Sequence, residues 1–202
     1  MNSLPQRPQP APAARPDRRA LPRSGAPPAY GKIACSGIEQ ICQVRDISAR
    51  GIRVEARTMP QPGQRVWIEM PGLAACPAVV VWRDRHHGGL VFESKQDIQA
   101  VFDGRPGASL PKPRGPRFSL RGPAELSCRE GTARLEAVDI AIGGLKLAGP
   151  THLPVGTRAR IKLGGLVEKL SGQVRWKEGD RLGFAFDRPM RRDDLCNILR
   201  RR

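Results

Sequence analysis

The sequence predicts a mainly β protein made of two tandem small antiparallel β-barrels, each followed by a C-terminal helix. Frequent turn residues, short runs of alternating apolar and polar residues, and an internal repeat lead to this prediction. The chain has 202 residues, of which 22 are Gly and 20 are Pro. Both residue types interrupt long helices and favour short strands joined by turns. Hydrophobic residues make up 39% of the chain, which is enough to form a core.

The internal repeat covers most of the chain. Residues 44–54 (VRDISARGIRV) and 137–147 (AVDIAIGGLKL) share the pattern Asp-Ile-x-x-x-Gly, and the two aspartates are 93 residues apart. Downstream, Trp82 corresponds to Trp176, and each tryptophan is followed ten residues later by a phenylalanine. Corresponding residues that keep nearly the same spacing over this length indicate a tandem duplication.

Each copy contains segments that alternate with period two, such as residues 65–70 and 158–163, and these predict strands. A segment with helical spacing then begins near Asp97 in the first copy and near Asp193 in the second. We interpret Trp82 and Trp176 as core residues, because they lie in apolar strands. The expected organisation is a disordered Pro/Arg-rich tail (1–17), a first domain (18–103), a Pro/Gly linker (104–113) and a second domain (114–202).

The chain is strongly basic, with 35 Lys and Arg, 19 Asp and Glu, and a formal net charge of +16. This balance favours an anionic partner such as a nucleic acid, an anionic membrane surface or a phosphorylated small molecule. Aromatic residues make up only 4%, so the stacking platform of a single-strand binder is missing and nucleic acid is not the expected partner. The sequence has no apolar run of membrane-spanning length and no secretory signal pattern, which predicts a cytoplasmic protein.

The sequence has few residues of the types that form catalytic or metal-binding sites. The five cysteines form no Cys-x-x-Cys pair, and there are only three histidines, two of them adjacent at His86 and His87. These spacings favour buried reduced thiols over a zinc or redox site. We therefore expect no enzymatic activity, no metal and no cofactor.

A pair of arginines with the spacing Arg-x-x-x-Arg precedes the aspartate motif in both copies, at Arg19–Arg23 and at Arg117–Arg121. In the first copy the motif that follows reads Asp-x-Ser-x-x-Gly. The two motifs in this order, on a small barrel with a terminal helix, resemble the PilZ domain, a family of bacterial receptors for cyclic di-GMP. The resemblance covers both copies and implies that each is a potential ligand site.

The resemblance also implies which residues bind the ligand. The expected first site comprises Arg18, Arg19, Arg23, Asp46, Ser48 and Gly51. The expected weaker second site comprises Arg117, Arg121, Asp139 and Gly144. The second site is expected to be weaker because Ala141 replaces the serine, although the spacing between the two motifs is five residues longer in the first copy.

By this resemblance, we expect a cytoplasmic cyclic di-GMP receptor or adaptor without an output domain. It would act on a protein partner in the control of motility, polysaccharide synthesis or surface attachment. The alternative is a degenerate pair of PilZ domains that serves as a protein-interaction adaptor without binding the ligand. The sequence leaves open which copy binds, the stoichiometry, the oligomeric state and the identity of the partner.

Overall fold

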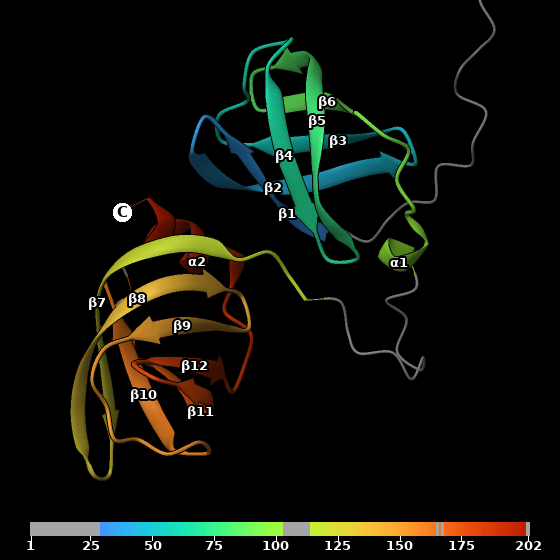
Figure 1. Cartoon of the computed structure of the whole chain (residues 1–202). Helices are drawn as coiled ribbons and strands as arrows, with labels where there is room; N and C mark the ends of the chain where they lie inside the picture. Colours follow the sequence, from blue (N-terminus) through green and yellow to red (C-terminus); the bar gives the residue numbers. More distant parts are fainter. Residues whose placement is uncertain (1–28, 103–113, 165, 167, 201–202) are drawn as a thin grey trace, which may run out of the picture.

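The computed structural model describes residues 29–102, 114–164, 166 and 168–200, which form two closed six-stranded antiparallel β-barrels (Figure 1). The predicted tail (1–17) and linker (104–113) lie outside the described residues, as do Arg18, Arg19 and Arg23.

Each barrel is formed by six consecutive strands. Those of the first barrel are β1 (Ala29–Cys35), β2 (Ile38–Ser48), β3 (Gly51–Ala56), β4 (Arg65–Met70), β5 (Leu73–Asp84) and β6 (His87–Phe92). Those of the second barrel are β7 (Phe118–Cys128), β8 (Gly131–Ala141), β9 (Gly144–Ala148), β10 (Arg158–Leu163), β11 (Leu170–Glu178) and β12 (Arg181–Phe186).

The two barrels have the same topology. The strand order is β1-β2-β3-β6-β5-β4 in the first barrel, and β7-β8-β9-β12-β11-β10 in the second, and each barrel closes between its first and fourth strands. The shared strand order confirms the predicted fold class, and it agrees with the duplication predicted from the sequence.

Alternation along the strands fills the interior of each barrel. In β4, Val66, Ile68 and Met70 are buried and the residues between them face outward, and β10 repeats this pattern. The buried residues form two separate hydrophobic clusters, one in each barrel. Each copy therefore has its own core, and the outward-facing residues are available for other roles.

The two C-terminal helices differ in length. The first, α1 (Gln99–Phe102), is a single turn, whereas α2 (Arg192–Leu199) spans eight residues and buries Leu195 and Ile198 in the core of the second barrel. Neither helix in the described part of the chain is long and apolar enough to cross a membrane.

Candidate ligand-binding site

The motif aspartates point to the outside of the barrels because a β-bulge precedes each of them. In β2 the register shifts between Val44 and Asp46, and in β8 it shifts between Ala137 and Asp139. Without this shift, simple alternation would place both aspartates in the core, two residues after a buried side chain. The bulge rotates the carboxylate outward, a common use of bulges beside functional sites.

Trp82 and Trp176 also lie on the outer surface, so the prediction that they belong to the core is wrong. Their side chains are 43% and 37% exposed. Each tryptophan follows a bulge, between Val80 and Trp82 in β5 and between Val174 and Trp176 in β11. Because the bulge adds one residue, the indole leaves the inward-facing side of the strand.

The aspartate and the tryptophan of each copy belong to one row of residues that runs across four strands. In the first barrel, the cross-strand partners are Asp46 with Arg53, Arg53 with Gly89, and Gly89 with Trp82. The indole of Trp82 lies over Gly89, where a side chain would collide with it. We call this set the first Asp–Trp row.

The second barrel repeats this row with one change. Asp139 pairs with Lys146, Lys146 pairs with Gly183, and Gly183 pairs with Trp176, whose indole again covers the glycine. This set is the second Asp–Trp row. Each row thus presents a carboxylate, a cation and an aromatic ring on one outer face, separated by strand spacings of about 4.8 Å.

One of the two predicted arginines of the second copy, Arg117, reaches this row. In β7, Phe118 and Leu120 are buried, so Arg117 and Arg121 face outward on either side of Ser119. Ser119 is the cross-strand partner of Asp139, and the register of β7 with β8 shifts between Ser119 and Gly122, so that Arg121 falls in the irregular stretch. Arg117 donates a hydrogen bond to Asp139 Oδ1.

Asp139 is the electrostatic centre of the second site. Its side chain is 16% exposed, and Lys146 Nζ lies 3.2 Å from Oδ2 while Arg117 holds Oδ1. One carboxylate is thus paired with two cations, and one positive charge remains unbalanced. An anion that arrives at this site finds more positive than negative charge, together with hydrogen-bond donors that are already oriented.

In the first copy, the motif serine stabilises the turn between β2 and β3. Ser48 Oγ donates to the backbone oxygen of Gly51 (3.2 Å) and accepts from the Arg50 N–H (3.4 Å). Ala141 occupies the corresponding position in the second copy and cannot form these bonds. Asp46 and Arg53 occupy the positions of Asp139 and Lys146, and the arginines predicted to accompany them lie outside the described residues.

The motif glycines are required because two backbones approach closely. A Cβ atom on Gly51 would lie 2.6 Å from the backbone oxygen of Leu90 in β6, and one on Gly144 would meet the backbone oxygen of Phe184 in β12. Neither glycine has a positive φ. Both glycines therefore allow neighbouring strands to pack, and they maintain the shape of the predicted site.

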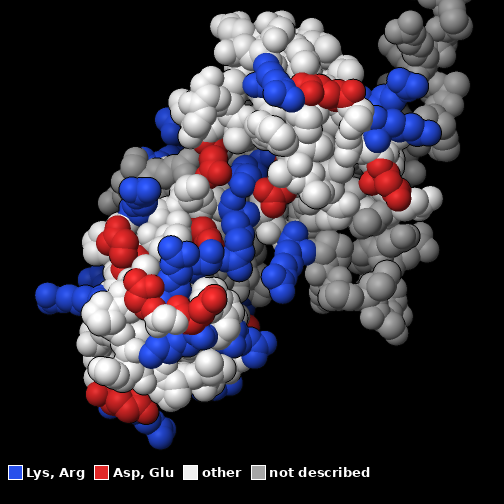
Figure 2. All heavy atoms as spheres, in the orientation of Figure 1, with Lys and Arg blue, Asp and Glu red and all other residues white. Residues whose placement is uncertain are grey.

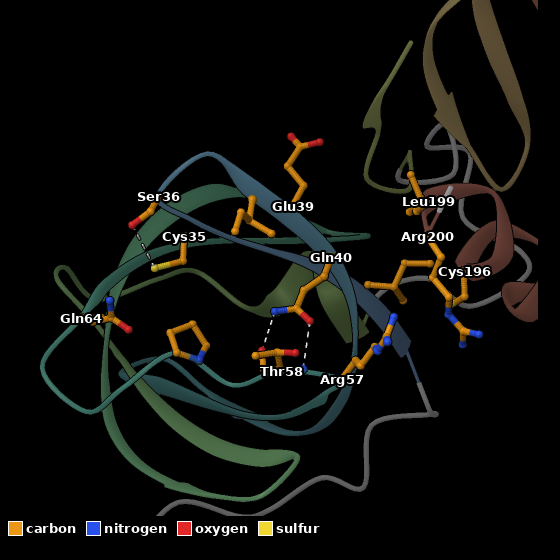
Figure 3. Close-up of a pocket in the computed structure, with 13 residues that line it drawn as sticks. Cys35, Ser36, Glu39, Gln40, Arg57, Thr58, Gln64, Cys196, Leu199 and Arg200 are labelled. Atoms are coloured by element: carbon orange, nitrogen blue, oxygen red, sulfur yellow. Dashed lines mark hydrogen bonds between the residues drawn. The ribbon is translucent and has the colours of Figure 1, made fainter. Parts of the chain in front are cut away.

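Basic side chains gather where the two barrels meet, with carboxylates among them, on the face shown in Figure 2. A separate cavity of about 640 Å³ lies between the first barrel and α2, where Gln40, Thr58 and Cys196 contribute to its wall (Figure 3). Its described lining includes no motif residue. The site predicted from the sequence is therefore on the outer barrel surface and distinct from this cavity.

The chain thus contains two barrels of the same topology, each with a corresponding row of side chains on its outer face. The family model of the PilZ domain matches residues 17–102 and 111–201, and the chain therefore belongs to the PilZ domain family. No match was found among curated proteins.

Several solved structures are similar to the chain. PlzA of Borreliella burgdorferi, solved in complex with c-di-GMP, has 10% identity and a TM-score of 0.39, with 83% of this chain and 85% of PlzA covered. The inhibitor of motility MotI of Bacillus subtilis has 11% identity and a TM-score of 0.35, with 88% and 97% covered. YcgR of Escherichia coli, in complex with c-di-GMP, has 15% identity and a TM-score of 0.31, with 78% and 75% covered.

Proposed function

We propose that this chain is a non-enzymatic receptor that binds cyclic di-GMP on the outer surface of its barrels and transmits binding to a protein partner. The observation that carries the proposal is the repeated Asp–Trp row, with Arg117 of the Arg-x-x-x-Arg pair bound to the aspartate of the second copy. Membership of the PilZ family supports the same ligand.

The groups in the row match the chemistry of this ligand. Cyclic di-GMP has two phosphates and two guanines, whose O6 and N7 atoms accept hydrogen bonds. A guanidinium binds either a phosphate or the O6/N7 edge through two parallel hydrogen bonds, which the ammonium group of lysine cannot reproduce. A carboxylate such as Asp139 accepts from the N1–H and N2–H groups of guanine. An exposed indole offers a flat surface on which a base can stack.

Within this proposal the first copy is the stronger site. It has the complete Asp-x-Ser-x-x-Gly motif, and its row contains Arg53 where the second row contains Lys146. Ser48 also orders the turn that supports the site. We infer that both copies bind and that the second binds more weakly.

The proposed output is a protein partner in the control of motility, polysaccharide synthesis or surface attachment. The proposed location is the cytoplasm. All five cysteines are free, in keeping with a reducing compartment.

Calorimetric titration of cyclic di-GMP into the full chain tests the proposal. We expect two binding events, a tighter one at the first site and a weaker one at the second. Arg19→Ala/Arg23→Ala should abolish the tighter binding event, and Arg117→Ala/Arg121→Ala should abolish the weaker one. The matched control is Arg158→Ala/Arg160→Ala, which removes two exposed arginines from β10, a strand outside the row, and should leave both events unchanged.

Two results would contradict the proposal. One is the absence of binding heat at a ligand concentration of about 1 mM, which would favour the ligand-independent adaptor. The other is an equal loss of affinity in the β10 control, which would indicate attraction by net charge alone. Titration with GMP, which has one base and one phosphate, should give much weaker binding if the geometry of the row recognises the cyclic dinucleotide.

A further inference from the structure

Residues 117–119, here called the Arg117 segment, have one backbone edge that no strand of their own barrel pairs with. Strand β7 pairs with β8 from Phe118 onward, but it pairs with β10 only through residues 124–127. Alternate residues of a strand direct their N–H and C=O groups to the same edge. Residues 117 and 119 therefore direct theirs away from β8, toward the side that β10 does not reach.

Two side chains of the first barrel bind these backbone groups. Lys32 Nζ donates to the backbone oxygen of Arg117 at 2.7 Å, and Glu39 Oε2 accepts from the backbone N–H of Ser119 at 2.7 Å. Both bonds involve a charged partner, which makes them stronger than bonds between neutral groups. The first barrel thus supplies the hydrogen-bond partners that β10 supplies to the later part of β7.

The two side chains are themselves fixed in place. Lys32 Nζ lies 3.5 Å from Glu39 Oε1 and 3.0 Å from Glu69 Oε2, and it is 6.0 Å from the centre of the Phe118 ring. The side chains of Lys32 and Glu39 are only 16% and 19% exposed. Glu39 also lines the cavity described above, and in Figure 3 its side chain points away from Gln40 and Thr58.

Apolar and aromatic contacts surround this polar group. Ile41, two residues after Glu39 on β2, packs against the core cluster of the second barrel. Tyr30, two residues before Lys32 on β1, places its hydroxyl where a side chain on Gly115 would collide with it. One outer face of β1 and β2 therefore holds the whole segment that leads into the second ligand site.

From these contacts we propose that Lys32 and Glu39 are positioning residues for the second ligand site. They hold the backbone at Arg117 and at Ser119 so that the guanidinium of Arg117 faces Asp139, and the second site is incomplete without the first barrel. The ligand part of this inference rests on the proposed function. It also means that a displacement of the first barrel changes the affinity of the second site, and the reverse holds by linkage.

The test uses the full chain with Asp46→Ala, which is designed to remove binding at the first site. Calorimetry with cyclic di-GMP then measures the Kd of the second site alone. Lys32→Met and Glu39→Ala should each raise the Kd of that site by about three- to thirtyfold. Glu39→Gln keeps an oxygen that accepts from the Ser119 N–H, and Lys32→Arg keeps a donor. Both conservative variants should retain most of the affinity, which separates positioning from general loss of folding.

The matched control is another Lys–Glu pair on the second barrel. Lys169 Nζ lies 3.4 Å from Glu125 Oε1, and both side chains are 41% exposed. Lys169→Met and Glu125→Ala change the charge by the same amount without touching the Arg117 segment, and they should leave the Kd within twofold. An equal effect in these controls would overturn the proposal.

Amide hydrogen exchange at Ser119, measured by NMR without ligand, tests the contact separately from ligand binding. We expect exchange at Ser119 to become faster by about tenfold or more in Glu39→Ala. Unchanged exchange would overturn the proposed contact, whatever the affinity. Faster exchange in a chain that shows no cyclic di-GMP binding would instead refute the proposed function, and with it the role of the contact in ligand affinity.

Discussion

Replacing Gly51 with alanine should destabilise the first barrel by about 2–5 kcal/mol. The new Cβ atom would lie 2.6 Å from the backbone oxygen of Leu90, whereas ordinary contact begins near 3.4 Å. Strands β3 and β6 would therefore have to separate by about 0.8 Å at Gly51, whose cross-strand partner is Val91.

The magnitude follows from two contributions. Overpacking of a rigid backbone contact costs about 1–3 kcal/mol. The separation of the strands also weakens one or two ladder hydrogen bonds, at about 1 kcal/mol each. For a barrel of this size, 1 kcal/mol corresponds to a change in Tm of about 4–8 °C. The transition of the first barrel should therefore shift downward by at least about 8 °C.

Scanning calorimetry of the full chain measures this shift, with Gly143→Ala as the control. Gly143 precedes the corresponding glycine of the second copy and does not have a positive φ, and a Cβ atom added to it would meet nothing within 4 Å. Its replacement should change the stability by no more than about 0.5 kcal/mol. If Gly51→Ala were as stable as the control, the close approach of β3 and β6 would not explain the motif glycine.

Three further predictions concern individual side chains. Trp176→Ala should weaken cyclic di-GMP binding at the second site about tenfold or more in calorimetric titration, because a stacking surface is lost. Ala141→Ser should strengthen that site by up to about tenfold in the same assay, because the hydroxyl can order the turn as Ser48 does. Burial raises the pKa of Glu39, but the Ser119 N–H and Lys32 lower it overall from its ordinary value of 4.5. Ionised Glu39 thus stabilises the fold above that value, and this contribution is lost as the pH falls through the folded-state pKa. Urea unfolding between about pH 3 and pH 6 should therefore depend less on pH in Glu39→Gln.

The sequence was sufficient to predict the barrels and the duplication, because alternation and turn residues determine them locally. It was misleading for Trp82 and Trp176, since Val80 and Val174 are buried and strict alternation places the tryptophans inward as well. The bulge that rotates them outward arises from the pairing with the next strand, which alternation within a single strand does not reveal. The same kind of bulge directs Asp139 outward, but the motif had already identified this residue as functional.

The contacts of Lys32 and Glu39 with the second barrel could not be predicted from the sequence. They join residues about 80 positions apart through backbone groups, and a backbone N–H or C=O carries no sequence signal. The length of the first helix also depended on tertiary packing. Helix α2 buries Leu195 and Ile198, whereas Ile98 and Val101 of the corresponding segment are only partly buried, and one helical turn forms there.

The central claim is that cyclic di-GMP binds on the two Asp–Trp rows, and NMR of the indole N–H signals tests it most directly. The chain has three tryptophans, and Trp67 lies on β4, outside both rows. Titration of the full chain should shift the signals of Trp82 and Trp176, Trp82 at the lower ligand concentration, and leave Trp67 unchanged. Unchanged signals of Trp82 and Trp176 at saturating ligand, or equal shifts of all three signals, would contradict the account.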